Sequence, residues 1–355
     1  MRILITGNMG YVGPVLVRHL RNTIGDAELI GYDAGFFGHS LTRTSGLPET
    51  MLDRQVYGDT RELPMALLEN VDAVVHLAAL SNDPIGTKFE KPTRDVNFKA
   101  SSRLAAMARD AGVKSFVFAS SCSVYGEAGE APRRETDGTN PLTAYAHSKI
   151  DTENALRQMD LGGMTVSCLR FATACGMSDR LRLDLVLNDF VACAIVDKTI
   201  TVLSDGTPWR PLIDVSDMAR AIEWAIGRNK DQGGASLVVN VGSDQWNYRV
   251  SELAQAVVAK VPGVSMSVNT NAPPDRRSYR VDFSLFRSLA PAHQPAMTLE
   301  NSITRIHDGL TSISFADSTF RSGPFIRLKE FERLMAAGLV TDDVRWNHAS
   351  RALAS

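Results

Sequence analysis

Three glycines at a regular spacing follow the first apolar run of the chain. The run Ile3–Ile5 ends at Thr6, and the segment Gly7–Gly13 (GNMGYVG) leads into a helical pattern over Val12–Arg21. Small residues are needed where a strand turns sharply and the backbone approaches a pyrophosphate, which the amides at the helix start then face. The spacing is GxxGxxG rather than GxGxxG, so an ordinary turn is an alternative for this motif taken alone.

An aspartate follows at the end of the second apolar run, Glu28–Tyr32, twenty residues beyond Gly13. A carboxylate at this distance is typical of a residue that binds both hydroxyls of an adenosine ribose and repels a 2′-phosphate. No Lys or Arg follows Asp33 until Arg43, so the pattern favours NAD over NADP. Asp59 is a candidate contact for the adenine amine, with a helix N-cap as the alternative.

Short apolar runs alternate with helical patterns through the chain, which predicts a parallel sheet covered on both faces. The expected strands are Arg2–Thr6, Glu28–Tyr32, Ala73–Ala78, Ser115–Ala119, Thr165–Leu169 and Leu237–Val241. The expected helices are Val12–Arg21, Asn97–Ala111, Asp184–Val196, Ser216–Ile226 and Val250–Ala259, with Gly31–Arg54 as a long surface loop. Beyond about residue 310 we expect a tail with one amphipathic helix, Phe325–Ala337, ending at Gly338.

These patterns predict an α/β fold, a Rossmann-type doubly wound parallel sheet with a smaller α/β substrate-binding lobe. We expect the NAD-binding domain at 1–168 with 212–242, the lobe at 169–211 with 243–310, and a C-terminal helical tail at 311–355.

Composition narrows the class of partner. The 355 residues carry a formal net charge of −2, which gives no reason to expect nucleic acid or an acidic membrane. The cysteines form no CxxC pair and the histidines show no HxxxH or HExxH spacing, so we expect no disulfide framework and no bound metal. No apolar stretch approaches membrane-spanning length, so we expect a cytoplasmic protein without a membrane partner.

A serine cluster and a YxxxK motif predict a catalytic site. Ser120–Gly126 (SSCSVYG) follows a buried strand, and Tyr145 and Lys149 lie four residues apart in a helical pattern, so they share a helix face. A free tyrosine has a pKa of about 10, and a neighbouring ammonium lowers that pKa. A serine hydroxyl across the pocket can stabilise charge on the substrate oxygen. An exposed surface pair is the alternative for YxxxK without this context.

Taken together, the sequence resembles the extended short-chain dehydrogenase/reductase family, in particular its NAD-dependent nucleotide-sugar epimerases and dehydratases. The matching pieces span about residues 1–310: TGNMGYVG (6–13), HLAA (76–79), DVN (95–97), SSCSVYG (120–126), YAHSK (145–149), LRFATACG (169–176), DGTPWRPLIDVSD (205–217) and NVGS (240–243). The resemblance implies Ser121 as the active-site hydroxyl, Tyr145 as the base, Lys149 as its partner, and Asn97 as a residue that orders the active-site helix.

From the motifs and the resemblance, the expected cofactor contacts are Gly7, Met9, Gly10, Tyr11, Val12, Gly13, Asp33, Asp59, Thr60, Leu77, Ala78, Ala79, Asn97, Tyr145 and Lys149. The expected substrate contacts are Ser121, Cys122, Ser123, Arg180, Arg210 and Arg276. Arginine suits a diphosphate because its planar fork donates two hydrogen bonds at once. A homodimer is also implied, with Leu104, Met107, Ala108, Ala155 and Leu156 in an apolar seam.

Departures from the family pattern narrow the activity. The 4,6-dehydratases carry an Asp-Glu pair directly after the active-site Ser or Thr, whereas this chain has Cys122 and Ser123. We therefore predict a nucleotide-sugar epimerase. An NAD(P)H-dependent reductase of a nucleotide 4-keto sugar is the alternative. A decarboxylase and a non-catalytic NAD-sensing protein are lesser ones. For Cys122, an acid/base role stands beside a simple packing role.

Overall fold

The computed structural model describes residues 1–42, 46–272 and 277–347. Its centre is a seven-stranded parallel sheet in the order β10-β6-β5-β4-β1-β2-β3. The strands are β1 (Arg2–Thr6), β2 (Glu28–Asp33), β3 (Arg54–Tyr57), β4 (Ala73–His76), β5 (Ser115–Ser121), β6 (Thr165–Phe171) and β10 (Ser236–Val241). The strand order reverses between β1 and β4, which opens a crevice at their carboxyl ends where open α/β sheets bind ligands.

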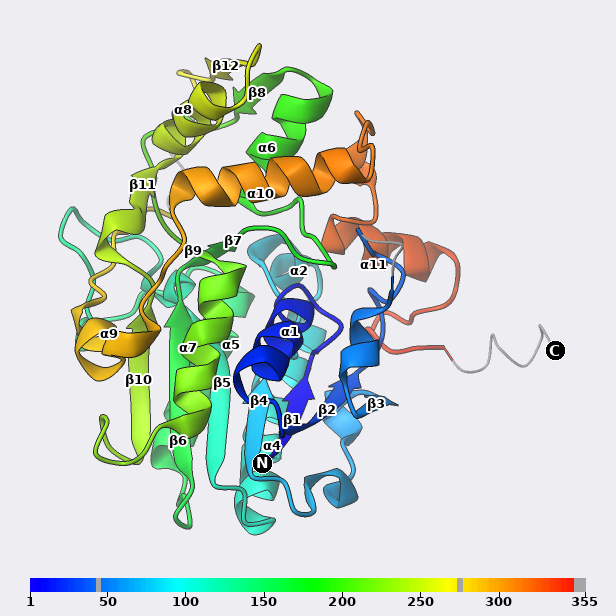
Figure 1. Ribbon diagram of the computed structural model, residues 1–355, viewed down its shortest axis with the longest axis vertical. Helices are drawn as coiled ribbons and strands as arrows, with labels where there is room; N and C mark the ends of the chain where they lie inside the picture. Colours follow the sequence, from blue (N-terminus) through cyan, green and yellow to red (C-terminus); the bar gives the residue numbers. More distant parts are fainter. Residues whose placement is uncertain (43–45, 273–276, 348–355) are drawn as a thin grey trace.

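Both faces of this sheet are buried, which explains its nearly continuous apolar runs. Along β1, Ile3 and Ile5 pack into one core while Leu4 packs into the other, because successive side chains point to opposite faces. The first face is covered by α1 (Gly13–Thr23) and α7 (Val215–Gly227), and the second by α4 (Ser101–Asp110) and α5 (Ala144–Gln158). Figure 1 shows α1 and α7 side by side in front of the sheet.

The remaining elements form a smaller lobe beyond the carboxyl ends of the strands (Figure 1). A three-stranded sheet has the order β11-β9-β7, and a two-stranded sheet pairs β12 with β8. These strands are β7 (Thr173–Cys175), β8 (Thr199–Val202), β9 (Trp209–Asp214), β11 (Asn247–Arg249) and β12 (Ser265–Val268). The helices around them are α6 (Val186–Val196), α8 (Val250–Lys260) and α10 (Leu299–Ser312), whereas α9 (Ser284–Leu289) lies beside β10 at the edge of the large sheet.

Three short elements precede α4 on the second face of the sheet. They are α2 (Asp83–Lys88), α3 (Glu90–Arg94) and a π-helical stretch, Asp95–Ala100, that runs directly into α4. A further helix, α11 (Arg327–Ala336), lies near the C-terminus. In Figure 1 it stands beside the segment that follows β2, far from it in sequence. No helix of the described residues is long and apolar enough to cross a membrane.

Most expected elements are confirmed with boundaries shifted by a few residues. The tail helix ends as predicted just before Gly338, which has φ +68°. The prediction for Gly31–Arg54 is wrong at both ends. Strand β2 continues to Asp33, β3 starts at Arg54, and a 3-10 helix occupies Pro48–Met51. This loop is also not confined to the surface, because Ser40 and Thr42 are buried.

Candidate active site

A large cavity, with a volume of about 820 Å³, runs along the carboxyl ends of the sheet strands. It begins at the glycine loop and the end of β2, passes the serine cluster and α5, and reaches Arg210 and Tyr279 in the smaller lobe. Pockets for small ligands usually enclose between about 300 and 1,000 Å³. The size and length of this cavity therefore suit an elongated ligand in the sheet domain with a second ligand against the lobe.

The glycine loop has the close backbone approaches that its spacing predicts. Gly7 has φ +77°, and a Cβ there would stand 2.5 Å from the backbone nitrogen of Ala78. A Cβ on Gly13 would stand 1.9 Å from the carbonyl oxygen of Asn8. Gly7, Gly10, Tyr11 and Val12 line the cavity at the start of α1. Any side chain at the first or last glycine would push the loop out of this shape.

Asp33 lies beside the loop and lines the cavity. Its carboxylate accepts hydrogen bonds from the backbone N–H groups of Met9 at 3.0 Å and of Gly35 at 2.7 Å. Burial raises the pKa of this carboxyl above its usual value, and the two hydrogen bonds oppose that rise. Met9 and Gly13 do not line the cavity. Met9 donates its backbone N–H to Asp33, and Gly13 packs against the backbone of Asn8.

The other expected cofactor contacts divide into two groups. Thr60, Leu77, Ala78 and Ala79 line the cavity. Asn97 does not; its side-chain amide holds both the N–H and the C=O of Leu80, at 2.8 and 3.0 Å, and donates to Ser148 on α5 at 3.1 Å. Asn97 therefore joins the loop after β4 to the helix that carries Tyr145, and it holds these two elements together without lining the cavity.

Asp59 also lines the cavity, but its carboxylate is already engaged. It accepts from the backbone N–H of Arg61 at 2.8 Å and forms an ion pair with the Arg61 guanidinium. Of the two interpretations offered for Asp59, the N-cap of the short helix Thr60–Glu62 is therefore confirmed. Its oxygens already have partners within the chain, and a contact with the adenine amine stays a prediction.

Ser121, Tyr145 and Lys149 come together at the centre of the cavity wall. Ser121 is the last residue of β5, and its Oγ accepts the N–H of Ser123 at 3.1 Å. Tyr145 is in the first turn of α5, which Thr143 caps by accepting the N–H of Ala146 at 3.2 Å. The Ser121 hydroxyl faces the Tyr145 hydroxyl and lowers its pKa. Helical spacing and a strand end thus position the two hydroxyls side by side.

Lys149 lies one turn further along α5, beneath the tyrosine. Its Nζ donates to the carbonyl of Ala119 at 2.7 Å and lies 5.5 Å from the centre of the Tyr145 ring. Burial lowers the pKa of Lys149 to about 8 and raises the pKa of Tyr145 to about 12. We expected the ammonium to lower the tyrosine pKa. In this structure burial outweighs it, and Ser121 and Arg182 supply the contributions that lower the pKa of Tyr145.

A buried ion pair holds this face of α5 against the sheet. Glu153, one turn after Lys149, accepts from Arg170 on β6 at 2.7 Å and from Ser120. Arg170 also donates to the hydroxyl of Tyr125 at 3.0 Å. Arg170 is therefore buried and paired inside the fold. This arrangement also separates the two serines, since Ser120 faces Glu153 and Ser121 faces Tyr145.

Among the expected substrate contacts, Ser123 and Arg210 line the cavity, and Arg276 lies outside the described residues. Two others are corrected. Cys122 is fully buried and its thiol donates to the carbonyl of Arg170, so it is a packing residue. Arg180 is fully buried in an ion pair with Glu49 at 2.6 Å, away from the cavity. Neither side chain can reach a ligand without the core opening.

A polar wall opposite Tyr145 was not predicted as a unit. Arg182 forms a two-pronged pair with Asp184, at 2.9 and 2.8 Å, and donates to Ser81 at 3.0 Å. Asn82 donates to Asp184 at 2.6 Å, and Thr143 donates to Asp83 at 2.7 Å. All of these residues line the cavity. The sequence places Arg182 next to Asp184 in the segment 180–184 (RLRLD), but only the fold brings Ser81–Asp83 beside this arginine.

Residues of the C-terminal tail also line the cavity, which sequence reasoning missed. They are Arg321, Ile326, Arg327, Phe331 and Val344. The amphipathic helix was visible in the sequence, but its period does not say which surface it covers.

The NAD dependent epimerase/dehydratase family matches residues 3–242, more than half of the chain. The chain therefore belongs to this family of NAD-dependent enzymes, which are of the extended short-chain dehydrogenase/reductase type. The cofactor is NAD, and the glycine cradle and Asp33 fit it, because they leave backbone amides and a carboxylate facing the cavity where a side chain would clash.

Named relatives are similar over most of their length. A Bacillus subtilis protein described as an uncharacterized UDP-glucose epimerase is 30% identical over 64% of this chain and 73% of its own. The UDP-glucose 4-epimerase of Streptococcus mutans is 27% identical over 78% of this chain and 87% of its own. The solved structure of MoeE5 with UDP-glucuronic acid and NAD is 26% identical, with a TM-score of 0.74 over 88% of this chain and 99% of that one.

Proposed function

We propose that this enzyme is a nucleotide-sugar epimerase that inverts a ring hydroxyl through a transient keto sugar. The observation that carries the proposal is that Ser121 and Tyr145 line the cavity wall together, with no carboxylate directly after Ser121. Elimination of water needs an acid at the leaving hydroxyl and a base at the adjacent carbon. At the two positions where such groups would stand, Cys122 is buried and Ser123 does not titrate usefully.

The roles of the protein residues follow from this geometry. Tyr145 accepts the proton of the sugar hydroxyl, while Ser121 hydrogen-bonds the same oxygen and stabilises its charge. Arg182 favours the phenolate form of Tyr145 electrostatically. Lys149 holds its helix against β5 through Ala119 and lies under the tyrosine ring. NAD held by the glycine loop and Asp33 would supply the acceptor of the ring-carbon hydride and its donor after the keto sugar has turned.

The substrate is proposed to be a UDP sugar. Relatives described as UDP-glucose 4-epimerases and the MoeE5 complexes with UDP-glucose and UDP-glucuronic acid support this class. Arg210 lines the lobe end of the cavity, where a nucleotide diphosphate would need a cation. Ser123 and Arg182 are positioned nearer to Tyr145, where the sugar would lie.

The reaction can be decided by mass. Purified protein is incubated with UDP-glucose, UDP-glucuronic acid and their N-acetylated counterparts, without added reductant, and the products are analysed by chromatography and mass spectrometry. The proposal expects a second stereoisomer of equal mass. A product lighter by one water would establish a dehydratase. In a parallel incubation with a UDP-linked 4-keto sugar, a product heavier by two hydrogens that forms only with added NAD(P)H would establish the keto-sugar reductase.

We also propose that the protein is a homodimer, although not through the seam expected from the sequence. Leu104, Ala108 and Leu156 are buried in the core on the α4/α5 side of the sheet, so they cannot form an interface. Met107 and Ala155 are only partly buried and remain candidates. Light scattering at micromolar concentration tests the assembly, and a monomer would contradict the proposal.

A further inference from the structure

The C-terminal tail has a hydrophobic cluster of its own against the cofactor-binding domain. In this cluster α11 and the residues after it pack on the loop that follows β4 and on the short helices beside it. The buried members are Leu80, Ile85, Phe89, Val96, Phe331, Leu334, Val340 and Val344. Because Leu80, Phe331 and Val344 also line the cavity, this packing forms part of the cavity wall.

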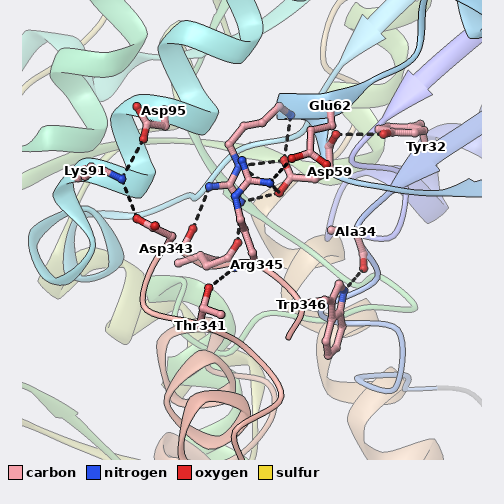
Figure 2. Close-up of polar contacts among 12 residues, drawn as sticks. Tyr32, Ala34, Asp59, Glu62, Lys91, Asp95, Thr341, Asp343, Arg345 and Trp346 are labelled. Carbon is pink, nitrogen blue, oxygen red and sulfur yellow. Dashed lines mark hydrogen bonds and ion pairs between the residues drawn. The ribbon is translucent and has the colours of Figure 1, made fainter. Parts of the chain in front are cut away.

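The segment after α11, residues 339–347, is here called the strap. It crosses the end of the cavity where Asp33 lies. Figure 2 shows Trp346 donating from its indole N–H to the carbonyl of Ala34, directly after that aspartate. The Trp346 ring stacks on Phe36 with 5.1 Å between ring centres. The strap is thus bound to the loop that carries the ribose-binding carboxylate.

A second set of contacts ties the strap to the other side of the same end. Arg61, whose guanidinium pairs with Asp59, donates to the carbonyls of Asp343 at 2.8 Å and Val344 at 2.7 Å. Arg345 forms an ion pair with Glu62. Figure 2 shows Asp59, Glu62 and Arg345 close together, with Lys91 joined to Asp343 beside them. The strap therefore bridges the two loops between which an adenosine would lie.

Val344 sits at the crossing point in an unusual backbone conformation. It is buried, lines the cavity and has φ +52°. A β-branched residue rarely adopts this region, and such strain persists only where surrounding contacts impose it. The two hydrogen bonds from Arg61 and the hydrophobic cluster impose it here. The strained residue faces the cofactor cavity.

Arg327, the first residue of α11, presents a buried cation to the same cavity. Its guanidinium lies 4.3 Å from the centre of the Phe37 ring, and its Nη2 donates to the carbonyl of Arg180 at 2.8 Å. Its Nη1 is buried and makes no hydrogen bond within the described residues. Arg180 and Arg182 beside it each have a carboxylate partner, Glu49 and Asp184.

A buried guanidinium with an unused donor is costly unless an anion meets it. Burial and the neighbouring arginines lower the pKa of Arg327 to about 9, because both disfavour its charged form. The anion available in this cavity is a diphosphate, either the cofactor's or the nucleotide sugar's. Phe37 follows Asp33 closely, and the segment of Arg180 is tied to the glycine loop by the hydrogen bond from Ser178 to the Tyr11 carbonyl, at 2.6 Å. Both neighbours place Arg327 at the cofactor's part of the cavity.

We propose that the tail completes the cofactor site: Arg327 binds the diphosphate of NAD, and the strap closes over the adenosine end and retards its release. Arg327 and the strap together retain the cofactor, so that one NAD stays bound while the sugar is oxidised and then reduced. The structural alignment with MoeE5 covers 99% of the MoeE5 chain but only 88% of this chain. About an eighth of this chain therefore has no aligned counterpart in MoeE5.

The first experiment removes the cation and keeps the volume. Arg327→Met is compared with Lys329→Met, which deletes an exposed cation from the same helix. NAD per protein is measured by release and chromatography after purification, and affinities of stripped protein for NAD and UDP are measured by calorimetry. We expect Arg327→Met to weaken NAD binding by about tenfold to a hundredfold, the size of a charged hydrogen bond, with UDP affinity within about twofold. Lys329→Met should match wild type in both.

The outcomes separate the two diphosphates. Loss of UDP affinity with unchanged NAD affinity would assign Arg327 to the nucleotide sugar and overturn the proposal, as would no change in either. Arg327→Lys covers the case in which the methionine variant does not fold. It keeps the charge without the two-pronged donor, so NAD affinity should fall between wild type and Arg327→Met. A lysine variant with wild-type NAD affinity would also contradict the assignment.

The second experiment tests the strap by rate. Trp346→Ala removes the stacking on Phe36 and the bond to Ala34, while Leu339→Ala changes an exposed side chain of the same segment. NAD release is followed by stopped-flow dilution. We expect release from Trp346→Ala to be about tenfold faster, with association changed far less. Equal release rates in Trp346→Ala and wild type would overturn the role of the strap. These readouts concern NAD binding alone, so they hold whichever reaction the enzyme catalyses.

Discussion

The two ends of the cofactor cavity are built in opposite ways. At the catalytic end, Ser121, Tyr145 and Lys149 come from one stretch of chain, and helix spacing with a strand end places them together. At the adenosine end, Ala34 and Trp346 are joined by a hydrogen bond across 312 positions of sequence. The reacting groups therefore depend on local geometry, whereas closure of the cofactor site depends on packing of a remote tail. Variants at the two ends should separate turnover from cofactor retention.

The largest effect is expected at the catalytic end. Tyr145→Phe removes only the hydroxyl that accepts the substrate proton, so kcat should fall by about a thousandfold or more. NAD content should stay at the wild-type level, because the ring and the fold remain. Both are measured on the same preparation. Turnover within about tenfold of wild type would remove Tyr145 from the role of base.

The preference for NAD over NADP should depend on Asp33, at the adenosine end of the cavity. Asp33→Asn removes the charge that repels a 2′-phosphate and weakens acceptance from ribose hydroxyls, so NAD affinity should fall by about tenfold to a hundredfold. The preference for NAD over NADP should narrow. Asp53→Asn, at an exposed carboxylate paired with Arg21, is the matched control. An unchanged NAD/NADP ratio by calorimetry would contradict the assignment.

Acid should destabilise the sheet beneath the catalytic end through one buried histidine. His76 is buried between Thr6 and Ser101, and burial lowers its pKa to about 3. An unfolded histidine titrates near 6.5, so between these values the unfolded chain binds a proton that the folded chain does not. Stability is therefore fully present above about pH 6.5 and declines as the pH falls toward 3, with about 2 kcal/mol lost by pH 5.

Denaturant unfolding at several pH values measures this loss. His76→Gln should show a shallower decline between pH 6.5 and 5 than wild type, because it has no group to protonate. Identical slopes in the two proteins would show that another group controls the acid response.

The smallest effect concerns the strained residue of the strap. Val344→Gly relieves the positive φ but removes a side chain from the cavity wall, so NAD release should quicken several-fold. Unfolding free energy should change by no more than about 1 kcal/mol, because the two contributions oppose each other. Ser314→Gly, at φ +53° on an exposed part of the tail, controls for strain relief alone. Release from Val344→Gly at the wild-type rate would show that the strap does not close the cavity.

Much of the fold and of the catalytic end could be read from the sequence, because both rest on short-range rules. A strand buried on both faces is a continuous apolar run, and Tyr145 and Lys149 share a face through the period of their helix. The residues that were misplaced depend on partners elsewhere. The sequence favoured Arg180 as a diphosphate ligand, but the structure pairs it with Glu49. Cys122 was a candidate substrate contact, but its side chain is buried in the core. A charged residue in a sequence does not show whether its partner is solvent, a ligand or another part of the chain.

The sequence by itself determined most strands and helices of the large sheet, the glycine loop, the aspartate that ends β2 and the YxxxK spacing, because backbone sterics and periodicity act within a few residues. Only the tertiary structure decided what encloses them. The helical pattern near the C-terminus predicted α11 but not its seat against Leu80 and Phe89. Nor could it show that Arg327 enters the cavity with an unused donor. Hydrophobic burial is non-directional. An amphipathic pattern therefore predicts that one face of a helix is buried, but the surface that covers this face depends on the rest of the fold.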